Sequence, residues 1–589
     1  MRLLGYWGIP RDAEIYDRLR LITSGAGPRK ELRGQGWCIT AIPNNHARER
    51  TVATIIDDNN VRGLMAGRLF SQGGENLSIT NIDVKQLTQQ PLPVIAKTVW
   101  GSYLAAAVPS GDAHLVLARD PVGLGCGFIA HVNAGAIFGS QLSDVVHLLG
   151  AEPSINWSQL VTWISHGYLP SDATAIQGIM QVPAGTALII GREGSRQSTY
   201  WHPAAIASER RTVEADSVRE AFRSCVTAWI GQAPKVYVDL SGGLDSSAIA
   251  WAASSSGRPV SAGYIDYGMM AAADELPYAR QVADQFDIQL ERISGIEVLP
   301  LAPARQSLLR LNAPTSHILQ ARLNEVQSEL AGTGSVSLCG GGGDQAFYAR
   351  LEMPWQLHDH LAQGTIGRYF GQLAVASRRE GIPLVKLISA TVGSELYRWF
   401  RPASLCNHVT LTVSPPAWLR AEHRCSEDCS RHAARQITRG GRRLPAGKLR
   451  HAIELGFSVG MVDREYRPSL EYPMLSQPLV ELALSTPLHE LISSDQDRIL
   501  FRNAMHGVLP AAVVARQEKG DYTGMYQLGL QRYFAHAREL IMDGRAAALG
   551  IVDGPQAVAE LRVAALGHSV ELWPLLHLLS VELWCRSWS

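Results

Sequence analysis

The region after residue 216 alternates between helix-like and strand-like segments, and this alternation restricts the fold more than any other feature of the sequence. The expected elements are helices at 217–232, 246–254, 274–286 and 316–330 and strands at 235–240, 259–265, 288–293 and 335–340. Such alternation is typical of a parallel sheet with helices on both faces, whose ligands bind beyond the carboxyl ends of the strands. Functional loops are therefore expected after Leu240, Ile265 and Leu338.

The first part of the chain, up to about residue 205, has a different pattern. It contains short β-type runs separated by glycine, asparagine, proline and aspartate, among them TVATIIDD, HLVLARD, AIFGS and TALIIG. Runs of this kind predict a layered, largely β domain. Because 589 residues are several times the commonest domain size, we expect two domains, 1–205 and 206–589. Residues beyond 350 are expected to be mostly helical, with an irregular, mobile loop at 439–448 (RGGRRLPAGK).

The composition excludes several classes of protein. Hydrophobic residues make up 46% of the chain and charged residues 18%, which excludes a disordered scaffold. Lysine plus arginine number 54 and acidic residues 54, so no global field favours nucleic acid or an anionic membrane. The first 20 residues lack the pattern of a secretory signal, and no segment approaches 18 uninterrupted apolar residues. We therefore expect a cytoplasmic protein without a membrane span, in which 570–584 forms a packed amphipathic helix.

The cysteines give one ambiguous signal. Eight cysteines in 589 residues are sparse and scattered, which favours reduced thiols over a disulfide framework. His423, Cys425, Cys429 and His432 form a cluster of residue types that bind zinc. Their CxxxC spacing is not that of the usual zinc knuckle, and the surrounding segment is also typical of an exposed helix. We favour the helix and keep zinc as the alternative.

The sharpest chemical signal is the segment DLSGGLDSS, which lies between a predicted strand and a predicted helix. Its glycines allow close backbone approach to an anion, its hydroxyls donate hydrogen bonds, and the following helix directs its N–H groups at the same point. This predicts a pyrophosphate-binding loop, and an acid inside such a loop indicates Mg²⁺ bridging it to phosphate. The alternative is a turn that binds nothing. The expected ligand-binding residues are Ser241, Gly242, Gly243, Asp245 and Ser246.

This segment resembles the pyrophosphatase loop of the N-type ATP pyrophosphatases, in the asparagine-synthetase-like branch that adenylates a carboxylate. A second segment, LCGGGGDQAF at 338–347, is similar to the SGEGSDE loop of that branch. The resemblance implies that ATP and Mg²⁺ are the cofactors, with Asp344 as the second metal and pyrophosphate ligand beside Asp245. It also implies a backbone contact of Gly340 to the nucleotide and a main-chain contact of Tyr264 to adenine.

The N-terminal part resembles the glutaminase domain of asparagine synthetase, through 117–130, 137–149 and 167–190. The resemblance implies an αββα layered domain of the N-terminal nucleophile hydrolase type, followed by an adenine-nucleotide α-hydrolase-like domain with helical additions. That glutaminase uses an amino-terminal cysteine, whereas residue 2 here is Arg2 and the first thiol is Cys38. We therefore expect a degenerate domain without glutaminase activity, so that the amine comes from the substrate itself or from another molecule.

Synthetases of this branch that lack a glutaminase include β-lactam synthetases and lasso-peptide macrolactam synthetases. Three features favour the second group. Gly341 replaces the acidic residue of SGEGSDE, which leaves room for a bulky substrate. The segment RQEKGDYT at 516–523 is similar to the lysine-bearing loop of lasso cyclases, and the C-terminal LWPLLHLLSVELWCRSW is similar to the helix that ends them.

The lasso-cyclase resemblance implies ATP-dependent closure of a macrolactam in a ribosomally made precursor peptide. An Asp or Glu side chain of that peptide is adenylated, its N-terminal amine attacks, and AMP and pyrophosphate are released. The resemblance also implies a leader-peptide-binding protein and a leader peptidase as partners. A small-molecule amide synthetase is the first alternative, and a scaffold with a silent nucleotide site is the second.

Lys519 is then the expected catalytic lysine, which stabilises charge on the tetrahedral intermediate and the departing phosphate. Its alternative is a solvated surface lysine. The segment 454–473 resembles the region beside the acceptor site. The acidic residue that faces the substrate there is one of Glu454, Asp463, Glu465 and Glu471, and the sequence leaves the choice between them open. His317 is a further candidate, although a core or capping histidine is the preferred interpretation.

Overall fold

The computed structural model describes most of the 589 residues. The residues outside the description are 1, 10–12, 25–28, 43–51, 59–60, 72–73, 75–98, 112, 134, 171, 269, 271–273, 306–309, 350–353, 401–414, 425–428, 439–442, 461, 463–466, 468, 519, 570 and 589.

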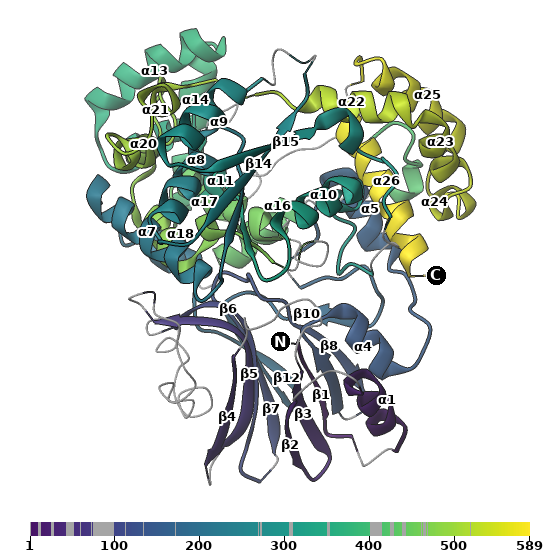
Figure 1. Ribbon diagram of the computed structural model, residues 1–589. Helices are drawn as coiled ribbons and strands as arrows, with labels where there is room; N and C mark the ends of the chain where they lie inside the picture. Colours follow the sequence, from purple (N-terminus) through teal and green to yellow (C-terminus); the bar gives the residue numbers. More distant parts are fainter. Residues whose placement is uncertain are drawn as a thin grey trace.

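The N-terminal part contains two six-stranded antiparallel sheets, at the bottom of Figure 1. The first sheet runs in the order β10 (Ile179–Gln181), β8 (Phe128–Val132), β9 (Gly135–Gly139), β1 (Arg2–Trp7), β3 (Trp37–Ile42) and β2 (Lys30–Gly34). The second runs in the order β12 (Gly194–Thr199), β11 (Thr186–Gly191), β7 (His114–Arg119), β6 (Val99–Pro109), β5 (Val61–Ser71) and β4 (Val52–Asp58). The helices of this part are α1 (Ala13–Thr23), α4 (Leu142–Leu149), α5 (Trp157–His166) and α6 (Pro203–Ala207).

The two sheets pack face to face because each presents a row of apolar side chains to the other. Leu3 and Ile39 of the first sheet share one buried cluster with Leu104 and Leu117 of the second. Helices α1 and α4 pack together on the face of the first sheet that is turned away from the second sheet. The prediction of a layered, largely β domain is confirmed.

The following part is built on a five-stranded parallel sheet. Its order is β15 (Gln289–Ser294), β14 (Val260–Asp266), β13 (Val236–Asp239), β16 (Val336–Leu338) and β17 (Leu470–Glu471). Its helices are α7 (Ala215–Ile230), α8 (Leu244–Ser254), α9 (Leu276–Gln285), α10 (Ala321–Ala331) and α11 (Gly343–Ala346). The predicted helix at 316–330 is split, since the 3₁₀ turn η4 (Ser316–Ile318) precedes α10. The predicted alternation is confirmed, and β17 is an edge strand that the sequence pattern did not indicate.

The rest of the chain is mostly helical, as predicted. Its longer helices are α12 (Gln356–Ala362), α13 (Ile366–Glu380), α14 (Leu384–Phe400), α16 (Cys429–Ile437), α17 (Ala446–Gly460), α18 (Gln477–Ser485), α20 (Ile499–Met505), α22 (Thr523–Arg532), α23 (Phe534–Met542), α25 (Gly554–Ala565) and α26 (Leu572–Ser587). The short elements are α19 (Leu488–Leu491), α21 (Ala511–Ala515), α24 (Arg545–Ala548), η3 (Gly295–Val298), η5 (Ala421–His423) and η6 (Pro473–Leu475).

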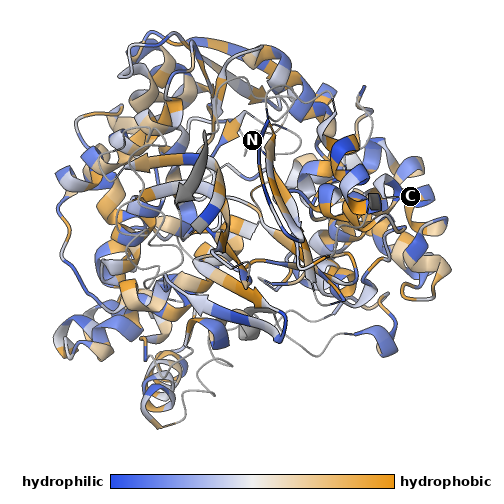
Figure 2. Ribbon diagram, turned by 90° about the horizontal axis from the view of Figure 1, so that it is seen from below, coloured by the Kyte–Doolittle hydropathy of each residue, from blue (hydrophilic) through white to orange (hydrophobic). Residues whose placement is uncertain are grey.

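Two predictions about this part can be compared directly with the structure. The loop predicted at 439–448 is wrong at its end, because Ala446 begins α17 and Lys448 is buried. The predicted packed helix near the C-terminus is confirmed as α26, which lies beside α5 in Figure 1. Hydrophobic and hydrophilic residues are mixed along the helices (Figure 2), as expected for helices that pack one face against a core. None of the helices in the described ranges is long and apolar enough to cross a membrane.

Candidate active site

The pyrophosphate-type loop joins the end of β13 to the start of α8. The Ser241 and Ser246 hydroxyls lie 3.0 Å apart, and the Ser241 N–H donates to Ser246 Oγ at 3.2 Å. Gly242 has φ +84°, and a Cβ there would lie 2.8 Å from the Glu275 carbonyl oxygen, so the turn requires glycine. Gly243 is the N-cap of α8, whose first-turn N–H groups have no partner inside the helix. Such a helix start is suited to bind an anion.

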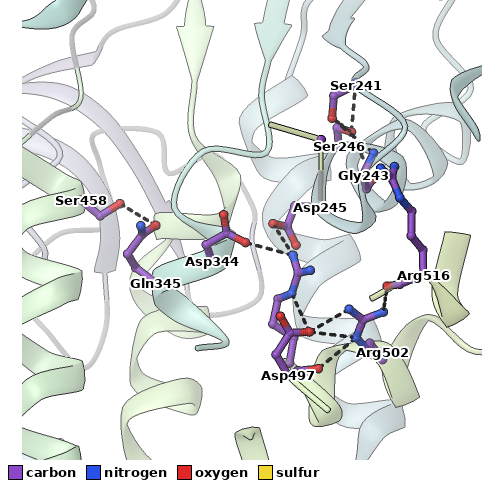
Figure 3. A network of polar contacts seen from close by, with 12 residues as sticks. Ser241, Gly243, Asp245, Ser246, Asp344, Gln345, Ser458, Asp497, Arg502 and Arg516 are labelled. Atoms are coloured by element: carbon purple, nitrogen blue, oxygen red, sulfur yellow. Dashed lines mark hydrogen bonds and ion pairs between the residues drawn. The ribbon is translucent and has the colours of Figure 1, made fainter. Parts of the chain in front are cut away.

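The second predicted loop follows β16, which is the neighbour of β13 in the sheet. A Cβ on Gly343 would lie 2.5 Å from Cγ of Asp245, so the glycine allows the two loops to touch. Gly340 also lies against this loop, since its Cβ would lie 2.9 Å from the Ser246 nitrogen. The sequence prediction that Asp245 and Asp344 lie together is supported by this arrangement, and Figure 3 shows them facing each other from α8 and α11.

Arg498, which the sequence reasoning missed, lies between these two carboxylates. Its Nη1 is 3.2 Å from Oδ2 of Asp245 and 3.0 Å from Oδ1 of Asp344. Burial alone would lower its pKa, but Asp245, Asp344 and Asp497 together raise the pKa of Arg498. It is the N-cap residue of α20 and carries no local motif that could have identified it. The single positive charge of the guanidinium offsets part of the negative charge of the two aspartates.

The donor set fits Mg²⁺, since carboxylate oxygens are its preferred protein ligands. Within the described residues no group of three or more His, Cys, Asp or Glu side chains could hold a metal ion. The remaining ligands of a magnesium ion at Asp245 and Asp344 would therefore be phosphate oxygens and water. Arg498 contacts one oxygen of each carboxylate, so an ion that bound those same two oxygens would displace it.

Tyr264 lies in β14, beside β13, and its side chain is buried. Its hydroxyl accepts a hydrogen bond from the Glu275 N–H at 3.0 Å, and burial raises the pKa of Tyr264. The β13–β14 pairing ends at Gly263, one residue before Tyr264. The main-chain contact to adenine stays a prediction.

Lys519 lies outside the described residues, but the chain on both sides of it is held in place. Glu275 contacts Arg516, Gly520 and Tyr522. Arg502 donates to the Arg516 carbonyl at 2.7 Å. The role of the lysine stays a prediction.

Gly341 is exposed, and the ring of Tyr472 lies beside it. A Cβ at this position would lie 3.1 Å from Cδ1 of Tyr472 and 3.4 Å from Sγ of Cys339. Tyr472 follows β17, and its side chain is buried. The room expected for a bulky substrate at this position stays a prediction.

Two of the four acidic candidates for the acceptor site lie within the described residues. Glu454 pairs with Arg450, and Glu471 is buried with its Oε1 3.1 Å from Nη1 of Arg68, so both are engaged by arginine. Asp463 and Glu465 lie outside the described residues. His317 lies in η4, which packs against α26.

The zinc alternative cannot be compared with the structure. Cys425 lies outside the described residues, as do the side chains of Cys429 and His432, while His423 ends η5. The backbone of Cys429–Ile437 is helical, as favoured above.

Arg2 takes part in the first sheet and binds neighbouring side chains. Its Nη1 donates to Oε1 of Gln141 at 3.0 Å and to Oδ1 of Asp144 at 2.9 Å. Cys38 is fully buried in β3, and burial raises the pKa of its thiol to about 11. A thiol held protonated and away from solvent is a poor nucleophile.

Two family models match the chain. The model described as "Asparagine synthase" matches residues 217–446 and 468–586, and the model described as "Glutamine amidotransferase domain" matches 71–201. The fold and the site define a protein with an N-terminal glutamine-amidotransferase fold of the N-terminal nucleophile type and an ATP-dependent ligase domain that forms C–N bonds. Because the first model covers more than half of its length, the chain belongs to the asparagine synthase family.

The solved structures that match the chain are low in sequence identity to it. Glutamine phosphoribosylpyrophosphate amidotransferase from B. subtilis complexed with ADP and GMP is 12% identical, with a TM-score of 0.23, and the match covers 52% of this chain and 83% of that one. The allosteric regulatory enzyme of purine biosynthesis is 11% identical, with a TM-score of 0.21, and covers 52% and 82%. No curated protein matches the chain.

Proposed function

We propose that this ligase closes a macrolactam in a ribosomally made lasso precursor peptide. The observation that carries the proposal is the set of contacts made by Arg2. This residue stands where the amidotransferase fold would present its nucleophile, and its guanidinium is bound to Gln141 and Asp144. A ligase of this family without its own source of ammonia must take the amine from a substrate. In a macrolactam the amine and the carboxylate belong to one molecule, which raises their effective concentration.

In the first step a side-chain carboxylate oxygen of the peptide attacks the α-phosphorus of ATP, and pyrophosphate leaves. Ser241, Ser246 and the first-turn N–H groups of α8 would bind the leaving pyrophosphate. Asp245 and Asp344 would hold Mg²⁺, which neutralises the charge that departs with pyrophosphate. The main chain near Tyr264 would orient adenine beside Gly340.

In the second step the N-terminal amine attacks the acyl carbon, loses a proton, and displaces AMP. The developing oxyanion and the AMP phosphate both need a cation close by. Lys519 would supply this charge, because its neighbours in the chain are fixed beside the nucleotide strand through Glu275. A leader-peptide-binding protein and a leader peptidase would present the free amine.

One observation favours a second candidate, a β-lactam-type or other small-molecule amide synthetase. The corresponding position of β-lactam synthetases carries a tyrosine, and here the ring of Tyr472 lies beside Gly341.

Mass spectrometry separates the two candidates. Linear peptides with a free amine and an internal Asp or Glu are incubated with the protein, ATP and Mg²⁺, with and without partners encoded beside its gene. Macrolactam formation predicts loss of one water per peptide and one AMP per ring, and no product from the same peptides with an acetylated amine. AMP formation that depends only on small amino or carboxylic acids would contradict the peptide substrate.

A further inference from the structure

Glu275 lies outside both glycine-rich loops, yet its contacts connect them to the segment around Lys519. It ends the connection between β14 and α9 and is 2% exposed. It occupies the N-cap position of α9, where an acidic side chain commonly accepts from the N–H groups of its own helix. Its side chain makes no such capping bond. The carboxylate is directed to another part of the chain instead.

The carboxylate binds residues on both sides of Lys519. The Gly520 N–H donates to Oε1 of Glu275 at 3.1 Å, and Nη1 of Arg516 lies 2.6 Å from the same oxygen. The hydroxyl of Tyr522 donates to Oε2. One side chain therefore fixes the residue three positions before Lys519 and the residues one and three positions after it.

The backbone of Glu275 contacts the nucleotide side of the site. Its N–H donates to the Tyr264 hydroxyl at 3.0 Å. Its carbonyl oxygen lies 2.8 Å from where a Cβ on Gly242 would stand, so the pyrophosphate-type loop packs directly on it. Glu275 thus touches the strand expected to hold adenine, the loop expected to hold pyrophosphate, and the segment that carries the lysine.

The energetics favour a fixed arrangement over a loose one. A carboxylate this deeply buried costs several kcal/mol unless a cation and donors compensate it. Arg516 supplies the cation, and its guanidinium also lies 4.4 Å from the centre of the Tyr278 ring. Burial and the neighbouring Glu275 both raise the pKa of Tyr522, so its hydroxyl keeps the proton that it donates. Moving the segment would break these contacts together.

We propose that Glu275 is a positioning residue for Lys519. It holds Arg516, Gly520 and Tyr522, which flank the lysine in the chain, against the strand and loop expected to bind ATP. The inference rests on the proposed function, because Lys519 is the group that Glu275 would serve. Glu275 itself would contact neither ATP nor the peptide substrate.

Substitution of Glu275 separates positioning from nucleotide binding. Glu275→Gln keeps an oxygen for the Gly520 N–H and loses the charge that pairs with Arg516. We expect a fall in kcat of about 10- to 100-fold, the size expected when a catalytic group is displaced by about 1 Å. The KM for ATP should stay within about two-fold of the wild type, since uniform binding is retained. Glu297→Gln, an exposed glutamate of the same domain, is the matched control and should leave both constants unchanged.

A double variant tests whether Glu275 acts through the lysine. In a Lys519→Met background, Glu275→Gln should cause no further loss of kcat, because the group that it positions is gone. A full additional loss would overturn the proposal, as would a rise in the KM for ATP that matches the fall in kcat. If Lys519→Met itself turns over at the wild-type rate, the proposed role of the lysine fails, which is a separate result.

Hydrogen exchange gives a readout that does not depend on activity. Loss of the acceptor in Glu275→Ala should speed exchange of the Gly520 amide, while peptides from α8 keep their protection. Unchanged exchange at Gly520 would overturn the proposal. Should the Glu275 variants fail to fold, Tyr522→Phe removes a single hydrogen bond to the carboxylate. It should lower kcat without changing the KM for ATP, and wild-type kcat in this variant would count against positioning.

Discussion

Replacing Arg498 by methionine removes the guanidinium that contacts both Asp245 and Asp344. Oδ2 of Asp245 and Oδ1 of Asp344 lie 3.2 and 3.0 Å from the same nitrogen of Arg498, so the two oxygens are close to each other. At a separation of about 5 Å and an effective dielectric constant near 20, two negative charges repel by ~3 kcal/mol. We expect the free energy of unfolding of Arg498→Met to fall by about this amount when no divalent ion is present.

The same geometry predicts how Mg²⁺ changes the result. In Arg498→Met the two carboxylates have no competing arginine, so an added ion should bind them and restore stability in proportion to its binding. In the wild type the guanidinium occupies the place between them, and Mg²⁺ without ATP should stabilise the protein much less. The assay is urea unfolding, or a thermal melt, with chelator and with excess Mg²⁺.

Two further variants complete this experiment. Arg498→Met combined with Asp344→Asn should recover stability without Mg²⁺, because one of the repelling charges is gone. Arg223→Met, an exposed arginine paired with Glu220, is the control and should respond to neither change. The reasoning is refuted if Arg498→Met loses stability that neither Mg²⁺ nor Asp344→Asn restores, or if Mg²⁺ stabilises the wild type equally.

Four other predictions concern single groups. Asp245→Ala or Asp344→Ala should abolish substrate-dependent AMP formation in a folded protein, and normal turnover by Asp245→Ala would remove this site from the mechanism. Lys519→Met should lower kcat by roughly 10²- to 10³-fold with little change in ATP affinity; wild-type turnover would make it a surface lysine. Glutamine should release no glutamate above a heat-inactivated control, and release that a glutamine-analogue inactivator blocks would contradict the role given to Arg2. Burial lowers the pKa of His577 to about 4. As the pH falls from about 6.5 to 4, this histidine therefore takes up a proton in the unfolded chain but not in the native chain. Unfolding in urea should show stability lost over that range, by up to ~3 kcal/mol for this group. His577→Asn should show a smaller loss, and an equal loss would refute the assignment.

The parts of the fold that the sequence predicted are those that depend on local pattern. The strand at 235–240 and the helix at 246–254 correspond to β13 and α8, because an apolar run, two glycines and a helix start lie within twenty residues. The loop with Asp344 was also predictable, since parallel strands end at one edge of the sheet and bring their loops together.

The parts that were missed depend on contacts between distant segments. Arg498 reaches Asp245 across 253 positions of the sequence, and no spacing rule connects them. The ring of Tyr472, which lies beside Gly341, comes from the segment after β17, and no local pattern connects the two residues. Glu471 was a candidate for substrate contact until burial against Arg68, 403 positions away, gave it a structural partner. Local sequence identifies chemically capable residues, and tertiary packing decides which of them face a substrate.

The amidotransferase-type domain contacts the parallel sheet of the ligase domain at its edge. Strand β17 is an edge of the parallel sheet, and an exposed edge invites wrong pairing. Arg68 of β5 binds Glu471 on this edge, and its guanidinium lies 4.9 Å from the centre of the Trp229 ring of α7. Cys339 begins the loop that leads to Asp344, and its N–H donates to the Glu471 carbonyl at 3.3 Å. The N-terminal domain therefore supports the strand that holds the second glycine-rich loop, and this contribution to the synthetase site does not require amide hydrolysis.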